Sequence, residues 1–457
     1  MKTRILIACF SLCICFGSVF AVSKTFSFQF LQKPGPYPIG LKVVDQYDRF
    51  HAYPSSPKNL SKPSVGDDAR PLQTLIWYPS LRSIGKPMTV GDYARLADTE
   101  IHFDEPHPEQ NRWRSLLKTS SEIPLWAVRD AKLAKGHYPV LIYAPSGSSV
   151  SWENADLCEY LASHGYVILA SPSMGVSTRD MTDDLDGINA QASDISFLIT
   201  YAKTLPDTDS SEVAVVSWSW GGASSLFAAA RDPRIDALVS MDGSMRYYPG
   251  LVRMAGDVHP ERMTIPLLFF TAENANFLED LDKHHDGPSA DIVGPSVLNA
   301  WIHGDLLTMN MLGMAHPEFS SMFQRRESAQ RFAENQVADY GRDDANTSHA
   351  WVALYTLNFL NAYLKHDASA KTFLERTPAE NGVPKHFMGI TFRPAQKVSP
   401  AKPRFQKGKI EAGAIPVSAE AEISYGRHVH QRVGAAIGGE LSHSQLPRAE
   451  SRISCCS

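Results

Sequence analysis

Short apolar runs alternate with amphipathic segments from about residue 139 to residue 365, and this alternation constrains the fold more than any other feature of the sequence. The runs are rich in Val, Ile, Leu and Phe, and their length fits buried strands. Near-continuous apolar strands separated by helices are typical of a mostly parallel sheet that is covered on both faces. The sequence therefore predicts an α/β fold. The predicted strands are 138–144, 166–171, 212–217, 235–241 and 265–272.

Helical patterns fill the intervals between these strands. The segment 154–165 is predicted to be a helix that closes at Gly165, and 351–365 is a second amphipathic helix near the end of the unit. From Ile188 to Ala202, apolar residues recur at alternating spacings of four and three, which places them on one helical face. That face is expected to pack on the sheet.

The flanking segments are less regular. Residues 71–79 are predicted to form an early antiparallel strand, and residues 80–136 a connection of unspecified shape. Beyond residue 395 the apolar periodicity ends, so 396–457 is predicted to be a largely disordered extension. We therefore expect one folded domain over residues 22–395.

The first 21 residues have the pattern of a secretory signal peptide. Lys2 and Arg4 precede an apolar run, and small residues lead to a cleavage site after Ala21. We expect export and a secreted or periplasmic location. A lipoprotein-like box at Cys9 has too short an apolar run before it, and an uncleaved anchor is the remaining alternative. Since no second apolar stretch of membrane-spanning length follows, no stable membrane span is expected after cleavage.

Charge and cysteine content exclude several classes of protein. The formal net charge is -5 and no stripe of cations is present, so a nucleic-acid partner is not expected. Of six cysteines, three lie in the signal segment, and the other three, Cys158, Cys455 and Cys456, do not form a disulfide framework.

The segment 213–225, VAVVSWSWGGASS, places two serines between a predicted strand and a predicted helix. A reactive serine needs a sharp strand-to-helix turn with small residues two positions before and two after it. Ser219 meets this condition, because Ser217 precedes it and Gly221 follows it. Ser217 has Val215 before it and no glycine after it, so its predicted role is to replace the first glycine of the motif G-x-S-x-G. An ordinary turn without chemistry is the alternative interpretation.

Six segments together resemble the platelet-activating factor acetylhydrolases and their bacterial relatives, which belong to the α/β-hydrolase fold near the dienelactone hydrolases. The resemblance covers roughly residues 33–365 and includes the entry segments 34–40 and 70–79. The six segments are YPVLIYAPSGSS, LASHGYVILAS, SWSWGG, LVSMDGSM, PLLFFTAE and GMAHPEF, in that order.

The resemblance implies a serine esterase with a Ser-Asp-His triad. Ser219 matches the nucleophile, Asp242 in LVSMDGS the acid, and His316 in GMAHPEF the base. The order Ser, Asp, His along the chain agrees with the usual order in this fold. His316 would take the proton of Ser219, and Asp242 would hold the imidazole in the required tautomer.

The resemblance also implies an oxyanion hole of two backbone N–H groups. One is that of Trp220, and the other comes from the loop Pro145-Ser146-Gly147-Ser148, where the family has His-Gly-x-Gly. An ungapped alignment selects Gly147, and a shift of one residue selects Ser148.

Several other side chains compete for these roles. Glu273 occupies an acid position that many α/β hydrolases use, and His349 is a rival base with an alternative structural role at a helix start. His284, His285 and Asp286, like the pair His428 and His430, are interpreted as solvated segments, and no metal site is expected. A hypothetical apolar pocket comprises Met309, Met311, Met314, Trp218, Trp220 and Trp301, although such residues more often fill a core.

We therefore expect an exported serine hydrolase that cleaves small-molecule or lipid esters without a cofactor. Amide or peptide hydrolysis by the same triad is one alternative. A non-catalytic binding protein of the same fold is another, because Ser217 and the altered oxyanion loop depart from the family pattern. The sequence does not predict the oligomeric state.

Overall fold

The computed structural model describes residues 28–53, 69–272, 296–326 and 340–397. These residues all fall within one compact unit, Met1–Ser399. The predicted signal segment 1–21 and nearly all of the predicted extension 396–457 lie outside the described residues, so both stay predictions.

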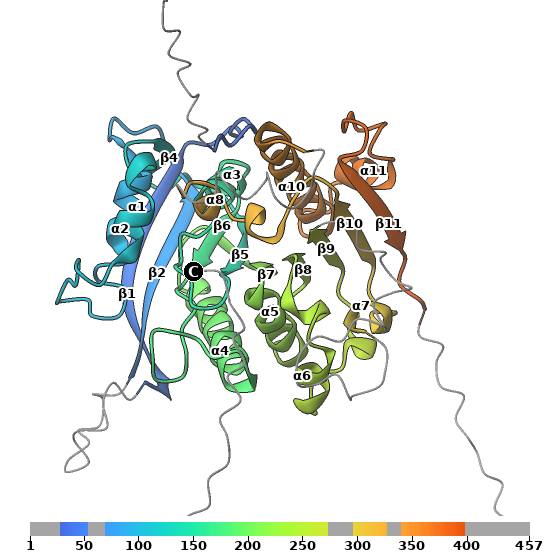
Figure 1. The fold of residues 1–457 in the computed structure, drawn as a ribbon, viewed down its shortest axis with the longest axis horizontal. Helices are drawn as coiled ribbons and strands as arrows, with labels where there is room; N and C mark the ends of the chain where they lie inside the picture. The colour runs from blue at the N-terminus through green and yellow to red at the C-terminus, as the bar shows by residue number, and fades with distance from the viewer. Residues whose placement is uncertain (1–27, 54–68, 273–295, 327–339, 398–457) are drawn as a thin grey trace, which may run out of the picture. The chain divides into compact units, whose positions relative to one another are not determined.

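A single mixed sheet organises the described residues (Figure 1). Its strand order is β11-β10-β9-β8-β7-β5-β6-β2-β1-β4-β3. The strands are β1 (Ile39–Ala52), β2 (Ala69–Pro79), β3 (Pro87–Thr89), β4 (Pro124–Arg129), β5 (Tyr138–Ala144), β6 (Val167–Ala170), β7 (Thr208–Trp218), β8 (Ala237–Met241), β9 (Leu267–Ala272), β10 (Leu306–Met311) and β11 (Met388–Arg393).

The centre of the sheet is parallel, and its flanks are antiparallel except where β1 pairs with β4. From β6 through β5, β7, β8 and β9 to β10, every neighbouring pair runs parallel. The strand β2 pairs antiparallel with β6 and β1, as the sequence predicted, and β11 pairs antiparallel with β10. The parallel centre therefore brings the carboxyl ends of six neighbouring strands to one edge.

Helices cover both faces of the sheet (Figure 1). They are α1 (Val90–Leu96), α2 (Arg112–Leu116), α3 (Ala155–Ser163), α4 (Leu185–Ala202), α5 (Trp220–Arg231), α6 (Pro249–Met254), α7 (Val297–Ala300), α8 (Ser321–Gln324), α10 (Arg342–Tyr363) and α11 (Ala368–Glu375). Short 3-10 turns are η1 (Lys118–Ser120), η2 (Ser244–Arg246), η3 (Pro260–Arg262) and η4 (His316–Phe319).

Two apolar cores result, one on each face of the sheet. Successive strand residues point to opposite faces, so Leu141 joins the core beneath α3 and α10, whereas Val140 and Ile142 join the core beneath α4 and α5. The predicted face of α4 is confirmed, since Ile188 and Ile195 are among its buried residues. The sheet thus gives the site a rigid support.

Three details of the sequence prediction need correction. The helix predicted from residue 351 begins earlier, at Arg342, because its first turn holds Asp343 and Asp344, and the Asp344 side chain accepts a hydrogen bond from the Gly341 amide. The connection 80–136 contains β3, α1, α2, η1 and β4. The strands β10 and β11 were not predicted.

Within the described part of the chain, no helix combines the length and the apolar character needed to span a bilayer.

Candidate active site

Ser219 lies at the turn between β7 and α5, with a left-handed backbone (φ 54°, ψ −125°) that non-glycine residues seldom adopt. The turn is fixed from three sides. The Ser219 amide donates to the Met241 carbonyl, and the Ser219 carbonyl accepts from the amides of Gly222 and Ser244. A strained residue held by its neighbours in this way presents its side chain outward at the end of the strand.

The two glycines after the serine permit close approach of backbones. A Cβ at Gly221 would lie 2.2 Å from the Ala144 carbonyl oxygen, and one at Gly222 would lie 2.6 Å from the Gly243 Cα. Small residues are therefore required where α5 meets the loops after β5 and β8.

Ser217 is part of the core and not of the exposed turn. It is completely buried, and its Oγ donates to the Val239 carbonyl at 3.0 Å and lies 3.3 Å from the Ser225 Oγ. Its hydroxyl is thus occupied by structural hydrogen bonds.

Asp242 follows β8, whose carboxyl end lies beside that of β7. Its amide donates to the Phe270 carbonyl, and its carboxylate is buried, with 3% of the side chain exposed. One oxygen, Oδ1, accepts from the Tyr247 hydroxyl at 2.8 Å and from the Ala272 amide at 3.3 Å. The other oxygen, Oδ2, faces His316.

His316 begins η4, which follows β10 and the turn after it. Its Nδ1 lies 2.6 Å from Asp242 Oδ2, and its Nε2 lies 3.0 Å from Ser219 Oγ. The imidazole therefore bridges the hydroxyl and the carboxylate. Its side chain is 43% exposed, so part of the ring is open to solvent.

The environment keeps Asp242 ionised. Burial by itself would raise the pKa of this carboxyl, but the hydrogen bond and charge of His316, together with the bonds from Tyr247 and the Ala272 amide, outweigh burial and lower the pKa below its usual value. A carboxylate that stays charged next to Nδ1 favours the tautomer whose Nε2 can accept the serine proton.

The two segments expected to supply an oxyanion hole lie against each other beside Ser219. Trp220 is the first residue of α5, where the geometry of a helix leaves the amide without an intrahelical acceptor. Across from it, Gly147 lies against the Trp220 ring, and a Cβ at Gly147 would be 2.9 Å from Trp220 Cδ1. Ser148 follows with φ 57°, and its Oγ accepts from the Met181 amide at 2.9 Å. Both candidate donors for the second position thus belong to the loop that borders Trp220.

Glu153 anchors this loop, and sequence reasoning missed it. Its carboxylate accepts from the Ser146 amide at 2.9 Å, from the Ser146 hydroxyl at 2.5 Å and from the Tyr143 hydroxyl at 3.0 Å. Its side chain is completely buried. The Ser146 amide is therefore committed to Glu153, in a loop that lacks the histidine of the related pattern.

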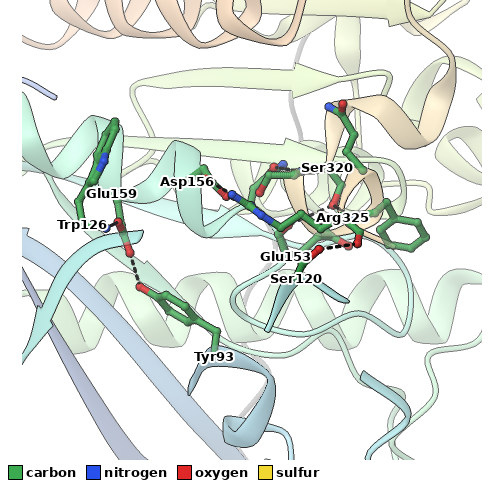
Figure 2. A network of polar contacts seen from close by, with 12 residues as sticks. Tyr93, Ser120, Trp126, Glu153, Asp156, Glu159, Ser320 and Arg325 are labelled. Atoms are coloured by element: carbon green, nitrogen blue, oxygen red, sulfur yellow. Dashed lines mark hydrogen bonds and ion pairs between the residues drawn. The ribbon is translucent and has the colours of Figure 1, made fainter. Parts of the chain in front are cut away.

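The backbone of the same segment holds the loop that carries His316. Figure 2 shows Ser320 next to Glu153, and the Ser320 hydroxyl and the Met322 amide both donate to the Glu153 carbonyl. Asn154 adds two bonds, accepting from the Ser321 amide and donating to the Phe319 carbonyl. The segment 153–154 thus connects the loop 145–148 to the loop that carries His316. An acidic residue at the entry of an apolar helix was the signal in the sequence.

Of the rival residues, the structure describes only His349. His349 is buried in α10, its ring contacts Phe28, and burial lowers its pKa to about 4, so it is neutral and remote from solvent. Glu273, the segment with His284, His285 and Asp286, and the pair His428 and His430 lie outside the described residues. Three methionines of the hypothetical pocket, Met309, Met311 and Met314, are buried in the same core as Trp218, and Trp301 is buried in the core on the other face.

The aromatic residues beside the serine form one side of the site. The Trp218 ring lies 5.2 Å from the His316 ring, and its Nε1 donates to the His316 carbonyl at 3.2 Å. Trp220 is partly exposed and stacks on Tyr248, with ring centroids 4.9 Å apart. The Trp218 ring thus contacts His316, and the Trp220 ring lies next to Ser219.

Comparison with known proteins identifies the fold of this chain. No family model matches the chain, and no curated protein matches its sequence significantly. Among solved structures, a ferulic acid esterase from Streptomyces cinnamoneus matches with a TM-score of 0.51 over 80% of this chain and 99% of that chain, at 18% sequence identity. This chain has an α/β-hydrolase fold. The likeness at this identity concerns the fold, and it confirms the fold class that the sequence predicted.

Proposed function

We propose that this chain is a serine hydrolase that cleaves carboxylic esters through a covalent acyl-enzyme. The observation that carries the proposal is the His316 ring, which bridges the Ser219 hydroxyl and the buried Asp242 carboxylate. The ester class is supported by the structural neighbour, which is an esterase, and by the resemblance to the platelet-activating factor acetylhydrolases.

Acylation follows from this geometry. His316 Nε2 takes the proton of Ser219 Oγ as the oxygen attacks the ester carbonyl, and the backbone N–H groups of Trp220 and Gly147 stabilise the tetrahedral oxyanion. The intermediate collapses as His316 returns the proton to the leaving alcohol, and the acyl group stays on Ser219. Asp242 stabilises the imidazolium throughout.

Deacylation repeats these steps with water. Water loses a proton to His316 and attacks the acyl-serine, and Ser219 leaves with that proton while the carboxylic acid departs. The 43% exposure of His316 supports such access for water.

Labelling with a fluorophosphonate probe tests the proposal. The wild-type protein is expected to be labelled, Ser219→Ala to lose the label, and Ser217→Ala to keep it, because the Ser217 hydroxyl is buried and bonded to Val239. A correctly folded wild-type protein that takes no label would favour a binding protein of the same fold.

The finer proposals concern substrate and location. We propose a short-acyl or phospholipid-type ester, as in the platelet-activating factor acetylhydrolases, and export through the segment 1–21. A panel of 4-nitrophenyl esters of increasing acyl length, run beside an oxidised phospholipid and an anilide of matched length, ranks the substrates and tests the amide alternative. Sequencing the amino terminus of the mature protein tests cleavage after Ala21.

A further inference from the structure

Two guanidinium groups share one aromatic ring near the proposed active site. Arg112 lies over the Trp113 ring at 4.8 Å from its centroid, and Arg326 lies at 5.0 Å from the same centroid. Arg326 also lies over the Phe323 ring, at 3.6 Å. Like charges placed so close repel each other unless an anion compensates them.

No acidic residue of the described ranges forms a salt bridge with Arg112 or Arg326. The two acids whose charges reach them are committed elsewhere, since Glu100 is paired with Arg179 and Glu153 accepts from Ser146 and Tyr143.

The side chain of Arg326 is itself unsatisfied. Its Nε is buried, without a hydrogen-bond acceptor among the described residues. Burial, with the charge of Arg112 as a second cause, lowers the pKa of Arg326 to about 10, which still leaves it cationic at neutral pH. Buried donors normally have partners, so an unpaired one suggests a missing acceptor.

Arg112 lies at a cleft, and packed aromatic rings connect Arg326 to His316. Arg112 and Trp113 line a cleft of about 270 Å³, together with Ser148 of the oxyanion loop and Arg179. From Arg326, the Phe323 ring leads to the Trp218 ring at 5.1 Å, and Trp218 contacts His316. Two aromatic rings thus separate Arg326 from the base.

Two of the three acidic residues that line the cleft are already paired with arginines. Asp98 is paired with Arg114 and Glu100 with Arg179, while Asp180 is exposed at the rim.

We propose that Arg112, which lines this cleft, and Arg326, which shares the Trp113 ring with it, bind an oxyanion group, a carboxylate or a phosphate, that the ester substrate carries. The inference rests on the proposed function and narrows its substrate class to anionic esters. The planar fork of a guanidinium binds such groups through two parallel hydrogen bonds. The Trp113 ring holds both side chains in place before the substrate arrives.

Matched pairs of esters test the inference. On the acyl side, 4-nitrophenyl hydrogen glutarate is compared with 4-nitrophenyl pentanoate, and on the alcohol side 4-carboxyphenyl acetate and 4-acetoxyphenyl phosphate are compared with phenyl acetate. For at least one anionic member, kcat/KM of the wild-type protein is expected to exceed that of its neutral partner. Arg326→Gln and Arg112→Gln should each lower that ratio about tenfold or more, the size of one lost charge-assisted hydrogen bond.

Two further variants make the test specific. Arg326→Lys keeps the charge without the fork and is expected to give an intermediate ratio, which also serves if Arg326→Gln does not fold. Arg231→Gln is the control, because Arg231 lies at the carboxyl end of α5 and is paired with the exposed Asp257. This substitution should leave the kcat/KM ratio of each pair of esters unchanged.

The outcomes separate the two proposals. Hydrolysis of the neutral esters with the same ratios in wild type and arginine variants would overturn the anionic subsite and leave the esterase proposal intact. Absence of turnover for all the esters would overturn both. The member of the panel that responds shows whether the bound group is a carboxylate or a phosphate, and whether the acyl or the alcohol part carries it.

Discussion

At the scale of a single residue, the two carboxylate oxygens of Asp242 have different hydrogen-bond partners. One oxygen holds His316, and the other is fixed by Tyr247 and the Ala272 amide. We expect Asp242→Asn to lower kcat by about 10³ to 10⁴, because the amide would stabilise the wrong tautomer of His316. Steady-state kinetics on a short 4-nitrophenyl ester measures this loss. The control Tyr247→Phe removes one bond to the other oxygen and should cost far less. Activity above a tenth of wild type in Asp242→Asn would move the acid elsewhere.

Glu153 is a positioning residue at the same scale. Because its carboxylate accepts both the amide and the hydroxyl of Ser146, Glu153→Gln brings an NH₂ group against one of these donors. We expect kcat to fall by about 10- to 100-fold with little change in KM, below the loss caused by removing an oxyanion donor outright. The affinity for a boronic acid inhibitor should fall in parallel.

A second buried glutamate provides the matched control for that variant. Glu159 belongs to the same helix region but bonds to Tyr93 and the Trp126 amide, away from the oxyanion loop (Figure 2). Glu159→Gln should leave kcat unchanged. Equal losses in both variants would mean that Glu153 acts only through the stability of the fold.

The helix α5 and the loop after β8 are coupled, at the scale of elements, through a contact between two glycines. A Cβ at Gly222 would lie 2.6 Å from Gly243 Cα, which follows Asp242 directly. Gly222→Ala should therefore push the loop that carries Asp242 away from the turn at Ser219. We expect this variant to have a lower kcat and a free energy of unfolding lower by about 1–3 kcal/mol. Urea denaturation checks the second effect.

Another glycine calibrates this measurement. At Gly389 in β11 the nearest atom to an added Cβ is 3.9 Å away, an ordinary contact. Gly389→Ala should change the unfolding free energy by no more than about 0.5 kcal/mol. If the Gly222→Ala variant is as stable and as active as Gly389→Ala, the turn at Ser219 accommodates the added methyl group.

The whole molecule responds to pH through buried acids, and Glu159 is the clearest of them. Burial raises its pKa from 4.5 to about 8, against the opposing hydrogen bonds of Tyr93 and Trp126. A carboxyl with a raised pKa binds its proton more tightly in the folded chain. Its contribution to stability is therefore complete below about pH 4.5 and is lost as the pH rises through about 8.

Thermal or urea unfolding across this range tests the sign. Relative to wild type, Glu159→Gln is expected to gain stability as the pH rises from about 5 to about 8, by an amount on the order of a few kcal/mol. Parallel curves for the two proteins would show that Glu159 is ionised in the folded state at all of these pH values.

The sequence predicted those parts of the fold that depend on local patterns. The strands at Tyr138–Ala144 and Val167–Ala170 and the buried face of α4 follow from apolar periodicity, and the fold class followed from their order. Of the residues that meet at His316, Ser219 was predicted from the motif around it, whereas Asp242 and His316 were implied by the resemblance to the platelet-activating factor acetylhydrolases. Glu153, by contrast, acts through tertiary contacts to Ser146 and Ser320, which leave no periodic trace. The edge strand β11 is short and partly exposed, so its apolar signal is weak.

The buried hydroxyl of Ser217 affects how similar chains can be recognised from their sequences. Since its Oγ donates to the Val239 carbonyl of the adjacent strand, a position usually described as demanding glycine here accommodates a side chain that ties two central strands together. A pattern search that insists on glycine would pass over this protein. A search that admits serine at this point, and asks for glycines at the two places where backbones touch, would retrieve it and any homologue built the same way.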